Sequence, residues 1–472
     1  MKTEYLIGDC VTRAQSISLI AERLSNEEFP GNEPRELALC IKNLAWLFIQ
    51  HIVEFINSDS YDPERDADYL RAIDYRVKLI SEPLRYVDGA SSDKVPWSLI
   101  DPFQEFARKI APDVVLILRP MWSFNYTILL EDLTEWLYDT AKYIFTDKEI
   151  QKALNNLDQN LHIISFPFTD RKSVLLHSIL AHEIGHIIIK EFLDSEISTI
   201  PEDIDSKIKS QVQKEVEDGT VLELFASNET SEKLKQVSEY RKRAIEEIGS
   251  DIVGIYMLGP AALFAYYSLA LGEEADSTPC PENNRYPPWR YRIYHSLEVL
   301  KSIGLVDWET LEKNSERKWL EYLKVYKENI DDIELFTSTC KRPKDDFIIE
   351  IAYDWFERSL EEIKEYIIQR CKSKSMVGEP AIFWENICSL ANKRLENDLP
   401  PNIVDDVNGY IKPSPIEAIL NSAWLFRLAK IPCFPNSTDD IEDYQNVRNK
   451  LDRLTLRALE ISYLQRIYDT WG

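Results

Sequence analysis

The segment from Ser173 to Leu193 constrains this chain more than any other, because it places imidazole and carboxylate groups inside an apolar helical pattern. It contains His182-Glu183-Ile184-Gly185-His186, an HExxH motif. At helical pitch the two histidines are one turn apart on the same face, and Glu183 is about 100° round the helix from His182. Two neutral imidazoles suit a zinc ion, and a neighbouring carboxylate suits the activation of water for hydrolysis.

The motif is short enough to arise by chance, and two buried histidines can also be satisfied by backbone or carboxylate partners. The surrounding apolar residues argue against that interpretation, because they cover the helix nearly all round and predict that it is buried. They are Leu175, Leu176, Ile179, Leu180, Ile184, Ile187, Ile188 and Ile189. Burying His-Glu-His there without a partner is costly. The pattern therefore predicts a zinc site with His182 and His186 as ligands.

Composition and charge exclude several classes of protein. The 472 residues are enough for two to four domains or for one large helical body. The formal net charge of −26 disfavours nucleic acid as a partner. We find no apolar run of signal-peptide or membrane-span length, so no membrane is expected as a partner. The seven cysteines are scattered and never spaced CxxC, which indicates reduced thiols and a cytoplasmic location.

Helical patterns dominate the chain, and β-rich patterns are confined to one region. Residues 113–120 and 122–130 predict a hairpin joined at Pro120-Met121, and Leu161–Phe168 predicts a third strand. Thr169-Asp170 is expected to cap the HExxH helix. We therefore expect a mainly α protein with a small β-sheet.

A catalytic zinc site needs a third protein ligand, which the other histidines are poorly placed to supply. His177 lies about 140° away from the face of His182. The remaining histidines, His51, His162 and His295, occur in other segments.

Two acidic residues in a later helical pattern are better candidates. Glu247 and Asp251 are four residues apart on one face, in a stretch that turns apolar from Ile245 to Leu258. Such pairs are usually solvated, but a buried pair requires a cation. We expect Glu247 to ligate zinc in preference to Glu246, because only Glu247 shares a face with Asp251. Asp251 could accept the free ring N–H of a ligand histidine, and Gly254 would allow the two helices to approach closely.

HExxH followed by Glu-x-x-x-Asp resembles the gluzincin class of zinc metallopeptidases, to which thermolysin-like enzymes belong. The resemblance covers roughly Leu161–Leu271. It implies that Glu247 ligates zinc, that Asp251 supports a ligand histidine, and that Glu183 is the general base activating a zinc-bound water against a peptide bond. It also implies that an extended substrate pairs with the strand at Ile163–Phe168. One departure is the spacing, since His186 and Glu247 are 61 positions apart, longer than in the compact thermolysin-like arrangement.

These patterns predict a zincin-like catalytic core embedded in a large helical body (α+β). We expect an N-terminal helical region at 1–110, the core at 111–305 with a charged helical insertion at 194–240, and a C-terminal helical region at 306–472. The flanks are expected to restrict access, which favours narrow specificity for a protein or peptide substrate, and to offer surfaces for a regulatory protein partner.

The tetrahedral oxyanion needs a donor besides zinc. The candidates are His295, Arg290, Arg292, Tyr256, Tyr266 and Tyr267, of which Arg292 and His295 are preferred. Two other functions stay open: a helical interaction or regulatory scaffold with a structural or silenced zinc site, and a zinc hydrolase acting on a non-peptide amide or ester. Glu183 argues against the scaffold, because a structural site needs ligands and no base.

Overall fold

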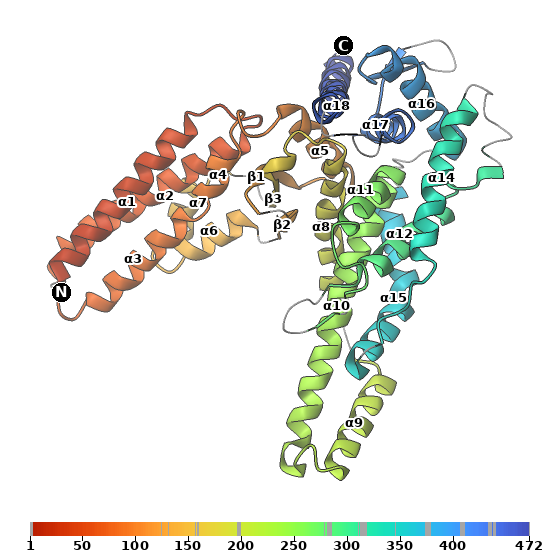
Figure 1. Cartoon of the computed structure of the whole chain (residues 1–472). Coiled ribbons are helices and arrows are strands. Elements are labelled where there is room, and N and C mark those ends of the chain that lie inside the picture. The colour runs from red at the N-terminus through yellow and green to blue at the C-terminus, as the bar shows by residue number, and fades with distance from the viewer. Residues whose placement is uncertain are drawn as a thin grey trace. The chain divides into compact units, whose positions relative to one another are not determined.

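The computed structural model describes residues 3–123, 125–130, 132–155, 157, 160–195, 200–277, 279–280, 286–309, 311, 319–344, 346–372, 379–405, 411–432, 437 and 440–471 (Figure 1). The chain forms two compact units, Met1–Lys172 and Ser173–Gly472. Helices predominate and the sheets are small, which confirms the predicted fold class. The division into 1–110, 111–305 and 306–472 stays a prediction, and the boundary between the two units falls inside its middle range.

The first unit is built on helices α1 (Thr3–Ser25) and α2 (Glu33–Ile56), which pack against each other. Along α2, Leu37, Ile41, Leu44 and Phe48 follow a helical repeat and are fully buried. The shorter helices of this unit are α3 (Ala67–Ser81), α4 (Leu84–Gly89), α5 (Trp97–Ile110), α6 (Leu133–Ala141) and α7 (Asp147–Ala153).

By length and composition, α2 is apolar enough to cross a membrane, contrary to the expectation that no segment has this property. It is the one helix of this kind among the described residues. The core helix of a water-soluble protein passes the same test, and one face of α2 is buried in the core of its unit. The helix alone is therefore a weak indication of a membrane segment.

The three-stranded sheet of the first unit has β3 (Leu161–Pro167) in the middle, between β1 (Val115–Met121) and β2 (Thr127–Leu129). β1 pairs with β3 in parallel and β2 pairs with it antiparallel. The strand expected at Leu161–Phe168 is confirmed, but the predicted hairpin is wrong. Pro120-Met121 lie inside β1 and not in a turn, and β3, whose residues are all buried, takes the central place between the two segments.

The order of the strands also bears on substrate binding. Ile163, Ile164 and Ser165 of β3 are paired with β1 on one side and with β2 on the other. A peptide can add to a strand only along a free edge. The prediction that a substrate pairs along Ile163–Phe168 is therefore wrong for Ile163–Ser165, because both of their edges are occupied.

In the second unit, the HExxH motif lies on α8 (Leu180–Ser195), which follows the 3-10 helix η2 (Leu176–Ile179) directly. The predicted cap at Thr169-Asp170 is wrong, because these residues lie in an earlier 3-10 turn, η1 (Phe168–Asp170). The 3-10 helix η2 leads directly into α8, as such turns commonly do at the ends of α-helices. The helix is buried almost all round, as its sequence predicts.

Helix α10 (Ala226–Leu258) is continuous over 33 residues. Its first half forms a helical hairpin with α9 (Glu202–Glu217), and α10 also packs against α8 and α15 (Phe347–Lys372) (Figure 1). The described part of the charged segment 194–240 is therefore largely helical, as predicted, and its second half begins the helix that carries Glu247. Gly259, at φ +61°, ends α10, and Pro260 begins α11 (Pro260–Ala270).

Among the described residues, the second unit also contains α12 (Trp289–Ser302), α14 (Leu320–Thr337), α16 (Pro380–Lys393), α17 (Ile416–Lys430) and α18 (Ile441–Trp471), with a ribbon of β4 (Ile403–Asp405) and β5 (Ile411–Pro413). Asn421 of α17 stabilises the α10–α11 corner, since its side chain accepts from Ala261 N at 2.9 Å and donates to Leu258 O at 2.6 Å. Helix α12 packs against α10 and α11, which brings its side chains to the HExxH region.

Candidate metal centre

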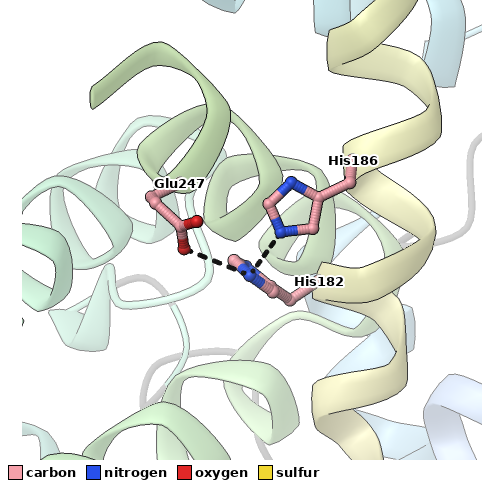
Figure 2. Close-up of side chains that lie close together, drawn as sticks. All are labelled: His182, His186 and Glu247. Carbon is pink, nitrogen blue, oxygen red and sulfur yellow. Dashed lines mark hydrogen bonds and ion pairs between the residues drawn. The ribbon is translucent and has the colours of Figure 1, made fainter. Parts of the chain in front are cut away.

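Three side chains from α8 and α10 converge on one point, and they are His182, His186 and Glu247 (Figure 2). One ligand atom of each lies within 4.8 Å of the other two. His182 Nε2 is 3.0 Å from His186 Nε2 and 3.6 Å from Glu247 Oε2. Ligands of a tetrahedral zinc ion with bonds of about 2.0 Å lie roughly 3.3 Å apart. The three residues therefore form a candidate site for one metal ion.

The second nitrogen of His182 faces a carboxylate. Asp251 Oδ1 is 2.8 Å from His182 Nδ1, and both side chains are buried. A carboxylate that accepts the Nδ1–H holds the imidazole in the tautomer whose Nε2 lone pair is available to a metal. Burial alone would raise the pKa of Asp251, but Arg292 and His182 outweigh it and lower the pKa to about 2. Asp251 is therefore ionised and fit to orient His182.

The charges of the buried site also suit a divalent cation. Glu183, Glu247 and Asp251 are three carboxyl groups that are each at least 96% buried, and Arg292 is the one guanidinium beside them that is buried to a similar degree among the described residues. With all three carboxyl groups ionised, the cluster carries a net charge of −2. Buried charges are stable only when they are compensated. An ion of charge +2 balances the cluster when Glu183 is ionised, so the residues fit the predicted metal.

Glu183 lies on α8 beside the triad and is 4% exposed. Burial is the main cause that raises its pKa to about 7, with the Glu247 carboxylate adding to the effect and His182 opposing it. A carboxyl group with a pKa near neutrality can both accept and release a proton under physiological conditions. Glu183 therefore has the protonation behaviour that a general base needs.

Two pairs of glycine contacts allow α8 and α10 to approach. A Cβ on Gly185 would lie 2.8 Å from both Cα and O of Ser250, and a Cβ on Gly249 would lie 2.7 Å from Ile189 Cδ1. At Gly254 a Cβ would make an ordinary 3.6 Å contact with the His182 backbone nitrogen but would overlap the Tyr266 hydroxyl, so this glycine makes room for α11 and its expected role between α8 and α10 is not supported. Gly185 and Gly249 therefore let α8 and α10 pack closely where the two helices face each other.

Replacing Gly185 with alanine is expected to lower the free energy of unfolding by about 1–3 kcal/mol, because the methyl group meets backbone atoms that cannot rotate away. Chemical denaturation followed by circular dichroism measures this change. Gly8 is a helical glycine with no atom within 4 Å of a Cβ, so Gly8→Ala is the matched control and should be neutral or stabilising by about 0.5–1 kcal/mol. Equal stability of the two variants would contradict the close approach of the helices.

The two residues preferred as oxyanion donors lie in different surroundings. Arg292 contacts Asp251 through Nε at 2.7 Å and Nη2 at 2.8 Å, and Glu247 through Nη1 at 3.1 Å. His295 packs edge-on against Tyr291, with ring centroids 4.5 Å apart, and also against Phe356. Burial lowers the pKa of His295 to about 3, so its imidazole is neutral. Its Nε2 is buried and has no hydrogen-bond partner among the described residues.

The other candidate donors are distributed over the same region. The ring of Tyr266 is 6.0 Å from that of His182, and its hydroxyl is buried and makes no hydrogen bond within the described part of the chain. Arg290 is bound to Asp276 at 2.6 and 2.8 Å. Tyr267 packs against Phe336, and Tyr256 is partly buried. Tyr266 is therefore the tyrosine that the structure places beside a triad residue.

The structure leaves the rejected ligand candidates outside the triad. Glu246 bonds to Arg243 at 3.0 Å and is more exposed than Glu247. His177 is buried in η2, one element before α8. His51 and His162 belong to the first unit.

Two contacts of the site were not predicted from the sequence. Arg243, one turn before Glu247 on α10, lies 3.4 Å from Glu247 Oε1 and packs on the ring of Tyr286. Arg and Glu four residues apart are a recognisable helical pair, so the spacing alone could have identified this contact. Arg292, by contrast, is 41 positions from Asp251, and only packing of α12 on α10 reveals their pairing.

No known protein family matches this chain, and neither a curated protein nor a solved structure matches it. The class of the protein is therefore defined by its own geometry: a mainly helical protein with a candidate metal centre of two histidines and one carboxylate.

Proposed function

We propose that this protein is a zinc-dependent metallopeptidase. The observation that carries the proposal is the meeting of His182, His186 and Glu247 within 4.8 Å, with Glu183 on the same helix as both histidines. Two histidines, one carboxylate and a free position form a ligand set of catalytic zinc sites. The presence of Glu183 supports hydrolysis over a structural role, because a structural site needs no base. The resemblance to gluzincins supports peptide bonds as the target.

The residues would divide the work as follows. His182, His186 and Glu247 would hold the ion, and Asp251 would keep His182 in the ligand tautomer. When bound, zinc lowers the pKa of water and polarises a carbonyl oxygen. Glu183 would take a proton from the attacking water and pass it to the leaving amine. The substrate would be a protein or peptide, and the reaction would take place in the cytoplasm.

The metal is tested first. Purified wild-type protein is expected to contain a single zinc ion per chain, and His186→Ala should lose it because two ligands remain. Elemental analysis measures the content and separates zinc from iron, which also binds two histidines and a carboxylate. His177→Ala removes a buried histidine outside the triad and serves as the control. Equal zinc in wild type and His186→Ala would sink the assignment.

The reaction is tested separately. A cleavage screen on proteome-derived proteins and peptides should show products with wild-type protein, fewer after chelation, and recovery with added zinc. Zinc-containing protein that cleaves no peptide contradicts the peptidase. Non-peptide amides and esters are tested in parallel. Their hydrolysis would indicate a zinc hydrolase with a non-peptide substrate, and no hydrolysis would indicate a scaffold with a structural or silenced site.

A further inference from the structure

We propose that Arg292 is a positioning residue of the metal centre. Its guanidinium holds the carboxylates of Glu247 and Asp251 in place and does not donate a hydrogen bond to the substrate. This inference rests on the metal site of the proposed function, and it does not depend on peptide bonds being the target. It replaces the role of oxyanion donor predicted for Arg292 from the sequence.

The contacts of the guanidinium carry the proposal. Its three nitrogens all face protein carboxylates: Nε and Nη2 bind the two oxygens of Asp251 at 2.7 and 2.8 Å, and Nη1 binds Glu247 Oε2 at 3.1 Å. The side chain is 7% exposed, and Trp289 covers it with its ring 4.2 Å away. A planar fork engaged in this way is fixed in direction. Three of its five N–H donors are therefore engaged with protein carboxylates before any substrate arrives.

The same contacts connect Arg292 to two of the three ligand residues. Asp251 Oδ1 binds Arg292 Nη2 and also faces His182 Nδ1, each at 2.8 Å. Glu247 Oε2, which Arg292 holds, is also the oxygen that faces His182 Nε2. Arg292 thus contacts the carboxylate ligand directly and the histidine ligand mainly through Asp251, with its own Nη2 3.5 Å from His182 Nδ1. Losing such an outer contact commonly costs about 10–100-fold in metal affinity.

If Arg292 acted only through its charge, its replacement would be expected to strengthen metal binding and not to weaken it. A positive charge close to the ion repels it, so removal of the charge alone would strengthen metal binding. Lysine retains the charge but is a point donor on a flexible chain and cannot form the fork. Arg292→Lys and Arg292→Gln therefore separate charge from geometry.

The experiment measures zinc affinity by competition with a chelator, and the visible absorption of the Co²⁺-loaded protein as a report on ligand geometry. Both Arg292→Lys and Arg292→Gln are expected to weaken zinc binding by about 10–100-fold and to change the cobalt spectrum. Asp251→Asn should produce a similar loss through His182. The control is Arg241→Lys, because Arg241 is a buried arginine of α10 that bonds to Ser359 at 2.8 Å and not to the triad. It should keep wild-type affinity and spectrum even if thermal stability falls.

Several results would overturn the proposal. If Arg292→Lys keeps the wild-type zinc affinity and cobalt spectrum, Arg292 contributes only its positive charge. If Arg292→Gln binds zinc more tightly than wild type, that charge repels the ion. If Arg292→Gln fails to fold, Arg292→Lys decides the question, because it retains the charge and removes the fork. If the wild-type protein binds no metal, the assignment of the metal site itself is wrong. If the wild type binds zinc and the Arg292 variants bind it equally well, only the role proposed for Arg292 is wrong.

Discussion

Replacing Glu183 with glutamine is expected to reduce the rate of hydrolysis by about 10²–10⁴-fold and to leave the zinc content unchanged. Glutamine has the size of glutamate but cannot accept the proton of the attacking water. Glu183 is not one of the three triad residues, so the ion should remain bound. The site should also tolerate the neutral side chain, because burial already raises the pKa of Glu183 to about 7.

The measurement is the cleavage rate on any substrate found in the screen, together with elemental analysis of the same preparation. Glu191 lies on the same helix, is exposed and pairs with Arg370, so Glu191→Gln is the matched control and should keep wild-type activity. Identical cleavage by wild type and Glu183→Gln would exclude Glu183 as the base. Loss of zinc in Glu183→Gln would instead show that its carboxylate supports the metal.

Replacing Glu247 with glutamine is expected to weaken zinc binding by more than about 100-fold, beyond the range associated with outer contacts. The carboxylate supplies the one anionic ligand of the triad. Glutamine is preferable to alanine here, since Glu247 also meets Arg292 at 3.1 Å and Arg243 at 3.4 Å. Alanine would leave Arg292 Nη1 without its acceptor, which costs about 1–3 kcal/mol and would confuse metal loss with unfolding.

Chelator competition on both Glu247→Gln and Glu246→Gln provides the test. The two residues are adjacent on α10, and only Glu247 lies in the triad, so Glu246→Gln should retain wild-type affinity. A large loss in Glu246→Gln with none in Glu247→Gln would reverse the assignment of the third ligand. Thermal unfolding of both variants without metal shows whether either effect arises from instability.

The local parts of the site follow from helical geometry. His182 and His186 share a face because four residues make about one turn, and Glu247 and Asp251 share a face for the same reason. Their burial follows from the apolar residues around each motif. The sequence therefore predicts the histidine pair, the acidic pair and two helices to hold them, and the structure brings three of these residues together.

The order of strands in the sheet could not be read from neighbouring segments. Residues 113–120 and 122–130 are close in sequence, but β3 lies between the two strands they contain. Strand pairing depends on which edges meet after the helices have packed, and hydrophobic pattern does not record this. The continuity of α10 could not be predicted for a related reason. Its charged first half has the pattern of a solvated segment, and its packing against α9 is a tertiary contact.

The sequence by itself determined the HExxH helix, the acidic pair and the mainly helical class, since each depends on periodicity within one segment. Only the tertiary structure decided the role that we propose for Arg292. Arg292 is 41 positions from Asp251 in the sequence, and their side chains meet because α12 packs on α10. Sequence spacing describes neighbours along one helix, whereas the direction of a side chain between helices depends on their packing. The sequence predicted that Arg292 donates a hydrogen bond to the substrate, but this packing places it against two carboxylates of the metal centre.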